Sequence, residues 1–234
     1  MAKIKKLGSI YFDGIPAFPG SELGEQKFSI GDTYLGMELQ WVRDGCRLVA
    51  DRCICINISW EQLNQMGFVF GTPVRIDGEL YLCRCLKVGA LPDTPNEWDI
   101  LLEQYGDDND LWHWKGMYFL GQETPPDWAT HRALRGDETA RHWNLGNAAG
   151  RGVYVGFRPV LEPLFPELSD LLVGSNIKVF GPCGEIIEGQ LAEYDDYDLV
   201  LDAATPSDCN WAVQHGGQSI ISQKFLIGIS DTKK

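Results

Sequence analysis

The chain has 234 residues, of which 44% are hydrophobic and 23% charged, as expected of a packed globular protein. Its formal net charge of −13 opposes direct binding to nucleic acid phosphates or to membrane surfaces. No apolar run approaches the ~18 residues of a membrane-spanning helix, and no signal-peptide core follows the N-terminal lysines. The seven cysteines lack a disulfide-scaffold spacing, which favours a reducing, intracellular compartment.

The first ninety residues predict mainly short strands separated by turns. A strand is expected over residues 51–59, where apolar side chains alternate. Ser59–Gln62 then has a capping-box pattern, which predicts a helix that ends at Gly67. Asp77-Gly78 is a two-residue turn signal between two apolar segments and predicts a hairpin.

A second helix is predicted at the next polar cluster. Thr94 is the expected cap, Pro95 fits the first helical position, and Glu97 completes a capping box. Apolar side chains recur at helical spacing as far as Tyr105, and Gly106 is the expected stop. Two short helices among strands predict the α+β fold class.

Regular periodicity fades between Asp107 and Gly156, a segment that holds four of the eight tryptophans and several glycines. A long aromatic segment of this kind is typical of a binding loop. The predicted ligand-binding residues are Trp112, Trp114, Trp128, Trp143, Asn144, Asn147, Arg151 and Tyr154. At least two of the four tryptophans are expected to be core residues instead.

Three strings in this part of the chain resemble the closing part of a C-type-lectin-like fold. They are Arg132–Gly136, Ala140–Trp143 and Val155–Glu162 (VGFRPVLE). The variant they resemble is shared by formylglycine-generating enzymes and by variable binding proteins of phages and diversity-generating retroelements. An upstream Asn96–Asp99 (NEWD) string is similar to those of many phage and prophage proteins. The resemblance covers residues ~50–165 and implies irregular loops presented on a stable β scaffold.

Within the closing string we assign scaffold roles to Gly156, Phe157 and Arg158. Gly156 would permit close backbone approach, Phe157 would fill the core, and Arg158 would satisfy buried carbonyls. A formylglycine-generating enzyme needs a reactive cysteine pair near this string, but no cysteine lies between Cys85 and Cys183. The chain is therefore predicted not to be an enzyme.

Three other residue sets suggest metal binding, and in each case the simpler interpretation is preferred. The two Cys-x-Cys pairs, Cys53/Cys55 and Cys83/Cys85, offer four thiolates for zinc but lack the usual turn, so buried thiols are expected. His113, His131 and His142, with Asp137 and Glu138 nearby, suggest a metal or acid–base site, but they lack a recognised ligand spacing, so exposed or structural histidines are expected. The acidic run Asp107–Asp110 lacks the remaining features of a calcium loop. We predict no metal and no cofactor.

The last 68 residues carry −7 of the net charge, and this shift predicts a domain boundary that divides the chain into residues 1–165 and 166–234. Leu171–Val179, Glu188–Leu191 and Leu199–Ala203 resemble the Sm/LSm core, which implies a small Sm-like (SH3-type) β-barrel after a short helix at 167–172. The family's RNA-contacting asparagine is replaced by Asp198, so direct nucleic acid binding is not expected. If copies of the chain form a homo-oligomer, we expect the contact between them to be made by the open strands of this barrel.

We therefore predict a non-enzymatic binding protein of a phage or prophage. Its lectin-like loops would recognise a protein or glycan partner, in the host cytoplasm or on the virion. The alternative is an intracellular phage inhibitor of a bacterial defence system, of the anti-CRISPR type, that uses its acidic surface to bind a basic effector. An enzyme of unrecognised chemistry ranks last.

Overall fold

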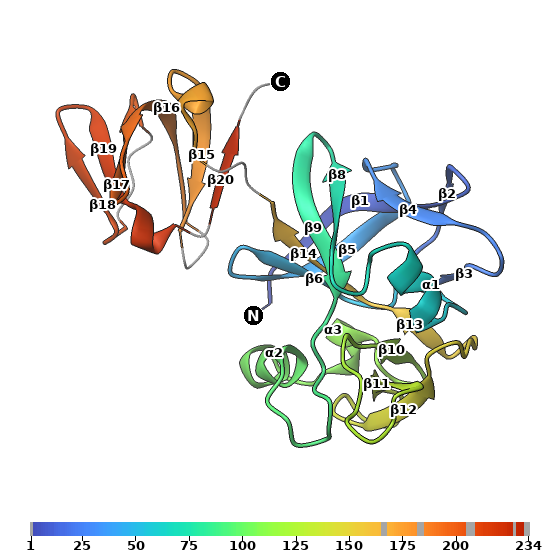
Figure 1. The fold of residues 1–234 in the computed structure, drawn as a ribbon. Coiled ribbons are helices and arrows are strands. Elements are labelled where there is room, and N and C mark those ends of the chain that lie inside the picture. The colour runs from blue at the N-terminus through green and yellow to red at the C-terminus, as the bar shows by residue number, and fades with distance from the viewer. Residues whose placement is uncertain (1, 165–167, 182–184, 205–208, 227, 232–234) are drawn as a thin grey trace. The chain divides into compact units, whose positions relative to one another are not determined.

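The computed structural model describes residues 2–164, 168–181, 185–204, 209–226 and 228–231. The chain divides into two compact units, Met1–Glu162 and Pro163–Lys234 (Figure 1). Whether residues 1–165 and 166–234 fold as independent domains stays a prediction. No helix in the described part of the chain is long and apolar enough to cross a membrane.

The predicted α+β class is wrong, because the chain is mostly β. Strands account for 45% and helices for 11% of the structure. The two capped helices do form, but they are short: α1 (Trp60–Gln65) has six residues and α2 (Glu97–Tyr105) has nine. A third helix, α3 (Asn109–Trp112), is a single turn. The segment 107–156, which was expected to be irregular, instead contributes three strands and part of a fourth.

The first sheet of unit 1 has eight strands and curls toward closure. Along the sheet the order is β2, β1, β5, β6, β14, β9, β8, and β4 also pairs with β1. The strands are β1 (Ile4–Phe12), β2 (Ile15–Ala17), β4 (Phe28–Gly31), β5 (Glu38–Asp44), β6 (Arg47–Ala50), β8 (Thr72–Ile76), β9 (Glu79–Cys85) and β14 (Pro159–Pro163). The Asp77 carboxylate accepts from the Thr33 amide at 2.8 Å and from the Thr33 hydroxyl at 2.6 Å. These bonds join the end of β8 to the end of β4.

The second sheet of unit 1 has six strands and carries the region singled out from the sequence. Its order is β12 (Trp143–Asn147), β11 (His131–Gly136), β10 (Tyr118–Leu120), β13 (Val155–Phe157), β7 (Cys55–Ile56) and β3 (Ser21–Glu22). Alternate residues of β10 and β11 face opposite sides. Phe119 and Ala133 pack with α2, whereas Tyr118, Leu120 and Leu134 pack with the larger core.

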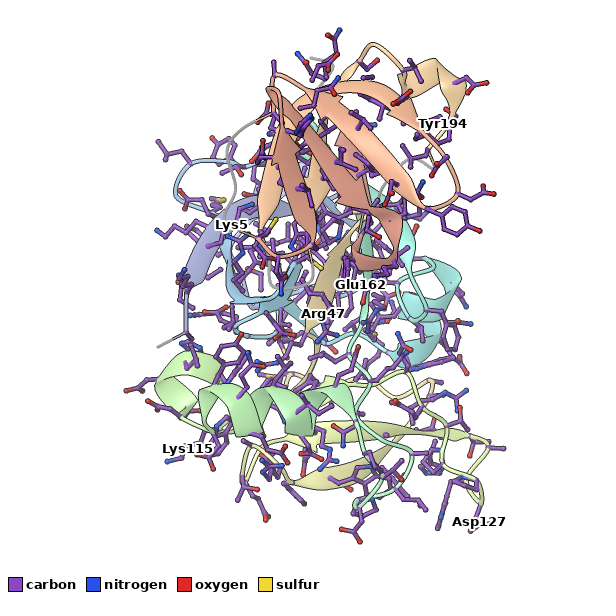
Figure 2. The ribbon with its side chains drawn as sticks, turned by 90° about the vertical axis from the view of Figure 1, so that its left-hand side faces the viewer. Lys5, Arg47, Lys115, Asp127, Glu162 and Tyr194 are labelled. Atoms are coloured by element: carbon purple, nitrogen blue, oxygen red, sulfur yellow. The ribbon has the colours of Figure 1, made fainter. Side chains whose placement is uncertain are left out.

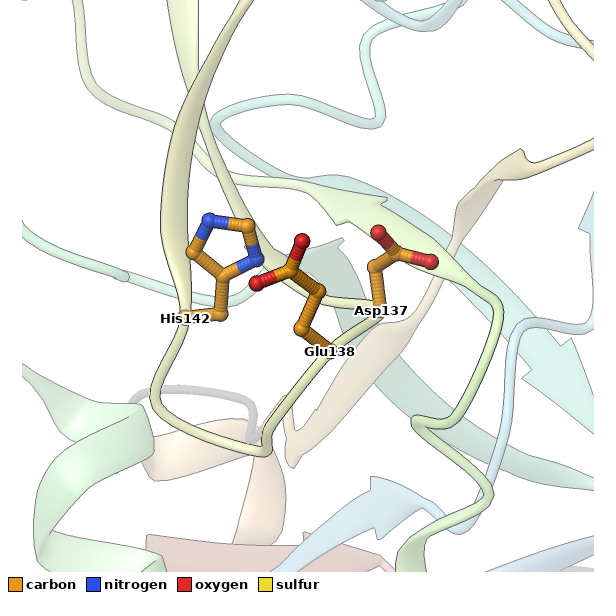
Figure 3. Close-up of side chains that lie close together, drawn as sticks. All are labelled: Asp137, Glu138 and His142. Atoms are coloured by element: carbon orange, nitrogen blue, oxygen red, sulfur yellow. The ribbon is translucent and has the colours of Figure 1, made fainter.

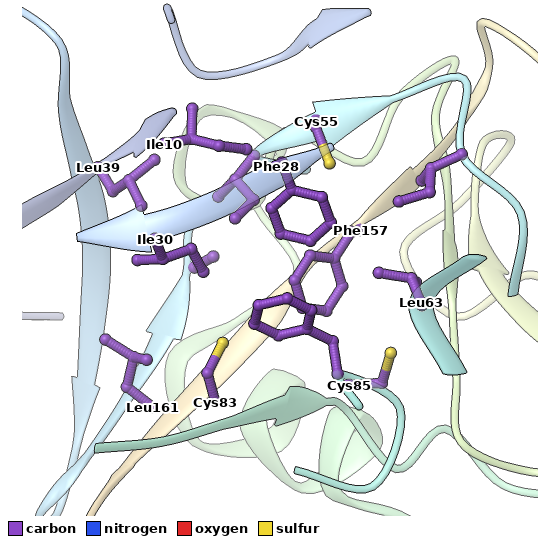
Figure 4. Packing of buried hydrophobic residues seen from close by; sticks show 14 of the residues in the cluster. Ile10, Phe28, Ile30, Leu39, Cys55, Leu63, Cys83, Cys85, Phe157 and Leu161 are labelled. Atoms are coloured by element: carbon purple, nitrogen blue, oxygen red, sulfur yellow. The ribbon is translucent and has the colours of Figure 1, made fainter. Parts of the chain in front are cut away.

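The larger core is centred on three aromatic rings, and the closing string supplies one of them. Phe28 stacks on Phe68 with centroids 4.7 Å apart, and Phe157 packs on Phe68 at 5.5 Å. Figure 4 shows Phe28 and Phe157 among the buried residues of this cluster. Cys55, Cys83 and Cys85 lie in the same cluster. Burial raises the pKa of each of these thiols well above its usual value, so they are protonated hydrophobic groups at neutral pH.

A buried ionic network joins the helix α2 to the sheet. Arg84 donates to both oxygens of Glu97 at 2.7 and 2.8 Å and also contacts Glu162. Arg47 donates to the same Glu97 carboxylate at 2.8 Å. Arg47 and Glu162, labelled in Figure 2, lie on the paired strands β6 and β14. The network therefore fixes the N-terminus of α2 against three strands.

This network predicts a specific pH dependence for Glu97. Burial opposes ionisation, but the bonds from Arg84 and the Lys87 amide hold the pKa of Glu97 below its usual value. A depressed folded-state pKa stabilises the fold fully above the unfolded pKa of ~4.3, and this contribution is lost as pH falls through the folded pKa. Glu97→Gln should lower the free energy of unfolding by about 2 kcal/mol at pH 7. Below pH 4 the free energies of unfolding of the variant and the native chain should become more similar.

Urea unfolding at pH 7 and pH 3.5 measures this difference. Glu103→Gln, on the exposed side of the same helix, is the matched control and should change little at either pH. A Glu97→Gln penalty that is independent of pH would contradict the assignment of the network as ionic.

Unit 2 is a single antiparallel sheet of six strands, in the order β18, β19, β17, β16, β15, β20. The strands are β15 (Asn176–Phe180), β16 (Ile186–Tyr194), β17 (Asp198–Asp202), β18 (Ala212–His215), β19 (Gln218–Ser222) and β20 (Gly228–Asp231). Every second residue is buried in β17 and in β16 as far as Leu191, and the apolar ones among them pack with Trp211. The last strand returns to pair with the first of the unit, β15.

One expectation for unit 2 changes in detail. The predicted helix over 167–172 is a 3₁₀ turn, Asp170–Leu172, and residue 167 lies outside the described residues. A second 3₁₀ turn, Gln223–Phe225, precedes β20, which begins at Gly228. Asp198 is the first residue of β17.

Candidate functional site

A pocket of about 310 Å³ opens on one face of the second sheet of unit 1. Its floor is apolar, with Leu120 from β10 and Leu134 from β11. A Cβ atom at Gly146 would lie 2.9 Å from the Leu134 side chain, so glycine at this position keeps the strands close and the floor open. The remaining lining comes from β10, β12 and the loop to β13: Tyr118, Asn144, Leu145, Asn147, Gly150, Arg151, Tyr154 and Val155.

Four of the eight predicted ligand-binding residues meet in this pocket. They are Asn144, Asn147, Arg151 and Tyr154. Tyr154 is 57% exposed, and both asparagines are also exposed. The Oδ1 atom of each asparagine accepts a bond from a nearby backbone amide, and the Asn144 amide also donates to the Tyr118 hydroxyl. The strands β12 and β13 belong to one sheet. Asn144 in β12 and Tyr154 just before β13 therefore line the same cavity although they are separated in the sequence.

The four predicted tryptophans lie elsewhere. Trp112 is fully buried, with its ring 5.1 Å from that of Trp98, and therefore belongs to the core rather than to a binding surface. Trp114 and Trp143 are partly buried, and their indole N–H groups donate to the carbonyls of Asp107 and Gly89. Trp128 is 51% exposed and packs edge-on against His131. Only one of the four is fully buried, where at least two were expected.

Arg151 holds the rim of the pocket in place. Its guanidinium donates to the Glu25 carboxylate at 2.7 Å, to the Asn57 carbonyl at 3.2 Å, and to the Gly24 carbonyl. Gly24 and Glu25 follow β3, and Asn57 follows β7, so Arg151 ties the loop between β12 and β13 to two other segments of unit 1. Arg151 therefore preorganises the loop that carries Tyr154.

Tyr118 is a pocket residue that sequence reasoning missed. Its hydroxyl accepts from the Asn144 side-chain amide at 2.9 Å and lies 3.4 Å from Nδ1 of His142. Burial, and next the Asp137 carboxylate, raise the pKa of Tyr118, so the phenol is protonated at neutral pH. The sequence contains only one signal for this role, a strand pattern at Tyr118, Phe119 and Leu120. This pattern places Tyr118 and Phe119 on opposite faces of the sheet but does not show which face carries a pocket.

A second groove, of about 760 Å³, lies between α2 and the turn from β11 to β12. At its base Arg135 donates to the Val88, Arg141 and Pro92 carbonyls and to the Asp99 carboxylate. Because these bonds satisfy the buried guanidinium, Arg135 braces the groove rather than offering donors to a ligand. The smaller pocket, with its exposed amides, is the better binding site.

The closing string forms β13 of this sheet and most of β14 of the first sheet, and its Val155 lines the pocket. Arg158 is fully buried, donates to the carbonyls of Ala50, Asp51 and Trp112, and stacks on the rings of Trp98 and Phe119. Burial lowers its pKa to about 10, so it remains charged at neutral pH. A Cβ at Gly156 would lie 2.7 Å from the Cys55 carbonyl, and Phe157 is a core residue.

The chemistry available in the pocket is hydrogen bonding and apolar contact. Its described lining residues include two amides, two phenols and one guanidinium, but no cysteine, serine, histidine or carboxylate. No protein-family model matches the chain, and comparison with curated proteins and with solved structures gives no match.

Proposed function

We propose that this chain is a non-enzymatic binding protein that takes one sugar unit of a glycan into the pocket between β12 and the loop that follows it. The observation that carries the proposal is the pairing of an apolar floor with exposed amides and a phenol around one small cavity. A pyranose presents both an apolar C–H face and ring hydroxyls, and amides can donate to and accept from those hydroxyls. The pocket volume is at the lower end of the range for small-ligand sites.

Different residues of the pocket contribute different contacts to binding. Tyr154 offers an exposed aromatic face, and Asn144 and Asn147 offer amide groups. The Arg151 contacts with Glu25 and Gly24 reduce the cost of ordering the loop on binding. The resemblance to lectin-like binding proteins of phages favours a ligand-binding loop surface, and a phage or prophage origin is part of the proposal.

The test is direct binding of the full chain to a panel of bacterial cell-wall and capsular glycans, followed by calorimetry on any ligand found. Tyr154→Ala and Asn147→Ala should each weaken binding by about ten-fold or more, because each removes a contact group inside the pocket. Trp128→Ala, an equally exposed aromatic outside the pocket, is the control and should bind normally.

Two results would overturn the proposal. The first is equal loss of binding in Trp128→Ala and Tyr154→Ala. The second is no glycan binding across the panel, together with salt-sensitive capture of a basic protein. That second result would establish the alternative, an acidic inhibitor of an intracellular effector, since only a charge-driven contact weakens steeply with salt.

A further inference from the structure

The turn between β11 and β12 brings three potential metal ligands together. Asp137, Glu138 and His142 each present a donor atom, and these atoms all lie within 4.8 Å of one another (Figure 3). The three come from six consecutive residues of one turn, outside the lining of the glycan pocket. The set is mixed, with one imidazole and two carboxylates.

The backbone holds two of the three ligands firmly. The amide of Asp137 donates to the carbonyls of Trp114 and Met117 at 2.9 and 3.1 Å. The carbonyl of His142 accepts from the Gly136 amide, and its own amide donates to Thr139. Glu138 is exposed, so its side chain can rotate toward the other two. The site therefore has two fixed ligands and one adjustable ligand.

A second, independent observation concerns the ion pairs of the two carboxylates. In the described part of the chain no lysine or arginine forms an ion pair with Asp137 or Glu138. Arg141 is adjacent in sequence, yet it pairs with Asp99 at 3.1 Å. Two negative charges next to an imidazole, without a cation from the protein, leave a place for an external one.

A buried polar side chain, Tyr118, also contacts two of the three proposed ligands. The Tyr118 side chain is only 9% exposed, and its hydroxyl lies 3.4 Å from Nδ1 of His142 and interacts with the Asp137 carboxylate. Metal ligands in proteins are usually oriented by such outer hydrogen-bonding partners. Tyr118 also accepts from Asn144, which fixes its hydroxyl between the turn and the pocket.

We propose that Asp137, Glu138 and His142 bind one divalent first-row transition-metal ion, with Zn²⁺ the best fit. The imidazole disfavours Ca²⁺ and Mg²⁺, which prefer oxygen ligands alone. Zinc–nitrogen and zinc–oxygen bonds of ~2.0–2.1 Å place tetrahedral ligands ~3.3 Å apart. The three donor atoms now lie within 4.8 Å of one another, so binding requires their side chains to rotate closer together. Three protein ligands leave a fourth position open to solvent or to a ligand. This inference departs from the expectation of no metal drawn from sequence spacing.

The experiment is titration of the metal-stripped full chain with Zn²⁺ against a chromophoric chelator, with circular dichroism of every variant to confirm folding. We expect one Zn²⁺ per chain. His142→Gln and Glu138→Gln should each weaken binding by about ten-fold or more, and His131→Gln should not. Glu138→Gln alters only an exposed side chain, so the test survives if the histidine variant misfolds. Ca²⁺ at the same concentration should not displace Zn²⁺.

The proposal fails if no Zn²⁺ binds in competition with the chelator, or if His142→Gln binds as the native chain does. Substitution with Co²⁺ gives a second readout, because thiolate ligands produce intense near-ultraviolet charge-transfer bands. Such bands would place the ion on the cysteines and overturn the assignment, whereas a spectrum typical of nitrogen and oxygen ligands would support it. The readout is metal binding alone, so it does not depend on whether a glycan ligand is found.

Discussion

Replacement of Arg158 by alanine is expected to lower the free energy of unfolding of unit 1 by about 3–5 kcal/mol. The guanidinium is fully buried and donates to three backbone carbonyls, which would lose their partners. The vacated space between the rings of Trp98 and Phe119 adds a cavity cost. For a unit of this size, the loss corresponds to a melting temperature lower by about 10 °C.

Thermal and urea unfolding, followed by tryptophan fluorescence, would measure this loss. Arg158→Lys keeps the charge but has one nitrogen in place of a planar fork, so it should recover only part of the stability. Arg141→Ala is the control: this side chain is 46% exposed and forms one surface ion pair, so its loss should cost less than about 1 kcal/mol. Equal losses for Arg158→Ala and Arg141→Ala would show that the buried guanidinium does not organise the core.

Replacement of Gly156 by alanine is expected to destabilise unit 1 by about 2–3 kcal/mol, a large effect for one methyl group. The new Cβ would lie 2.7 Å from the Cys55 carbonyl oxygen and 2.7 Å from the Cys53 Cβ. Cys55 lies in β7 and Cys53 lies just before it, so relief requires the strands β7 and β13 to separate. The Ile54 amide, which donates to the Phe157 carbonyl at 2.8 Å, would be strained by the same shift.

Gly31→Ala is the matched control for this prediction. Gly31 is also a strand glycine, but its Cβ would meet only the Tyr11 ring, at 3.4 Å or more, which is ordinary contact. Chemical denaturation of the two variants, side by side, separates the effect of close approach from the general effect of replacing glycine. If Gly156→Ala proved as stable as Gly31→Ala, the close approach of β7 and β13 would be wrong.

Local features of the fold could be predicted where neighbouring residues decide the structure. The capping box of α1 is present, with the Gln62 amide donating to the Ser59 hydroxyl at 3.1 Å, and Asp77-Gly78 does join β8 to β9. The cap of α2 is Asn96 rather than Thr94, because the Asn96 side chain accepts from the Asp99 amide. Competing cap residues within a few positions are not distinguished by pattern alone.

Features that depend on distant partners could not be predicted. The expected strand over 51–59 is reduced to Cys55–Ile56, since the pairing partners of this segment lie in β3 and β13. Trp112 and Trp128 have the same side chain and differ only in tertiary surroundings, and one is core while the other is exposed. Tyr118 became a pocket residue through the pairing of β10 with β11 and β13. Sequence spacing contains no information on such long-range register.

The position of β14 has a consequence for how the chain folds as it is synthesised. This strand is the last of unit 1 to leave the ribosome, yet it lies between β6 and β9 in the middle of the first sheet, where Val160 pairs with Val49. Until it inserts, β6 and β9 have unpaired edges, and an emerging chain exposes them to neighbouring nascent chains. Nascent chains that end before residue 159 should therefore bind chaperones and aggregate, and the full unit should fold slowly, after synthesis of its final strand.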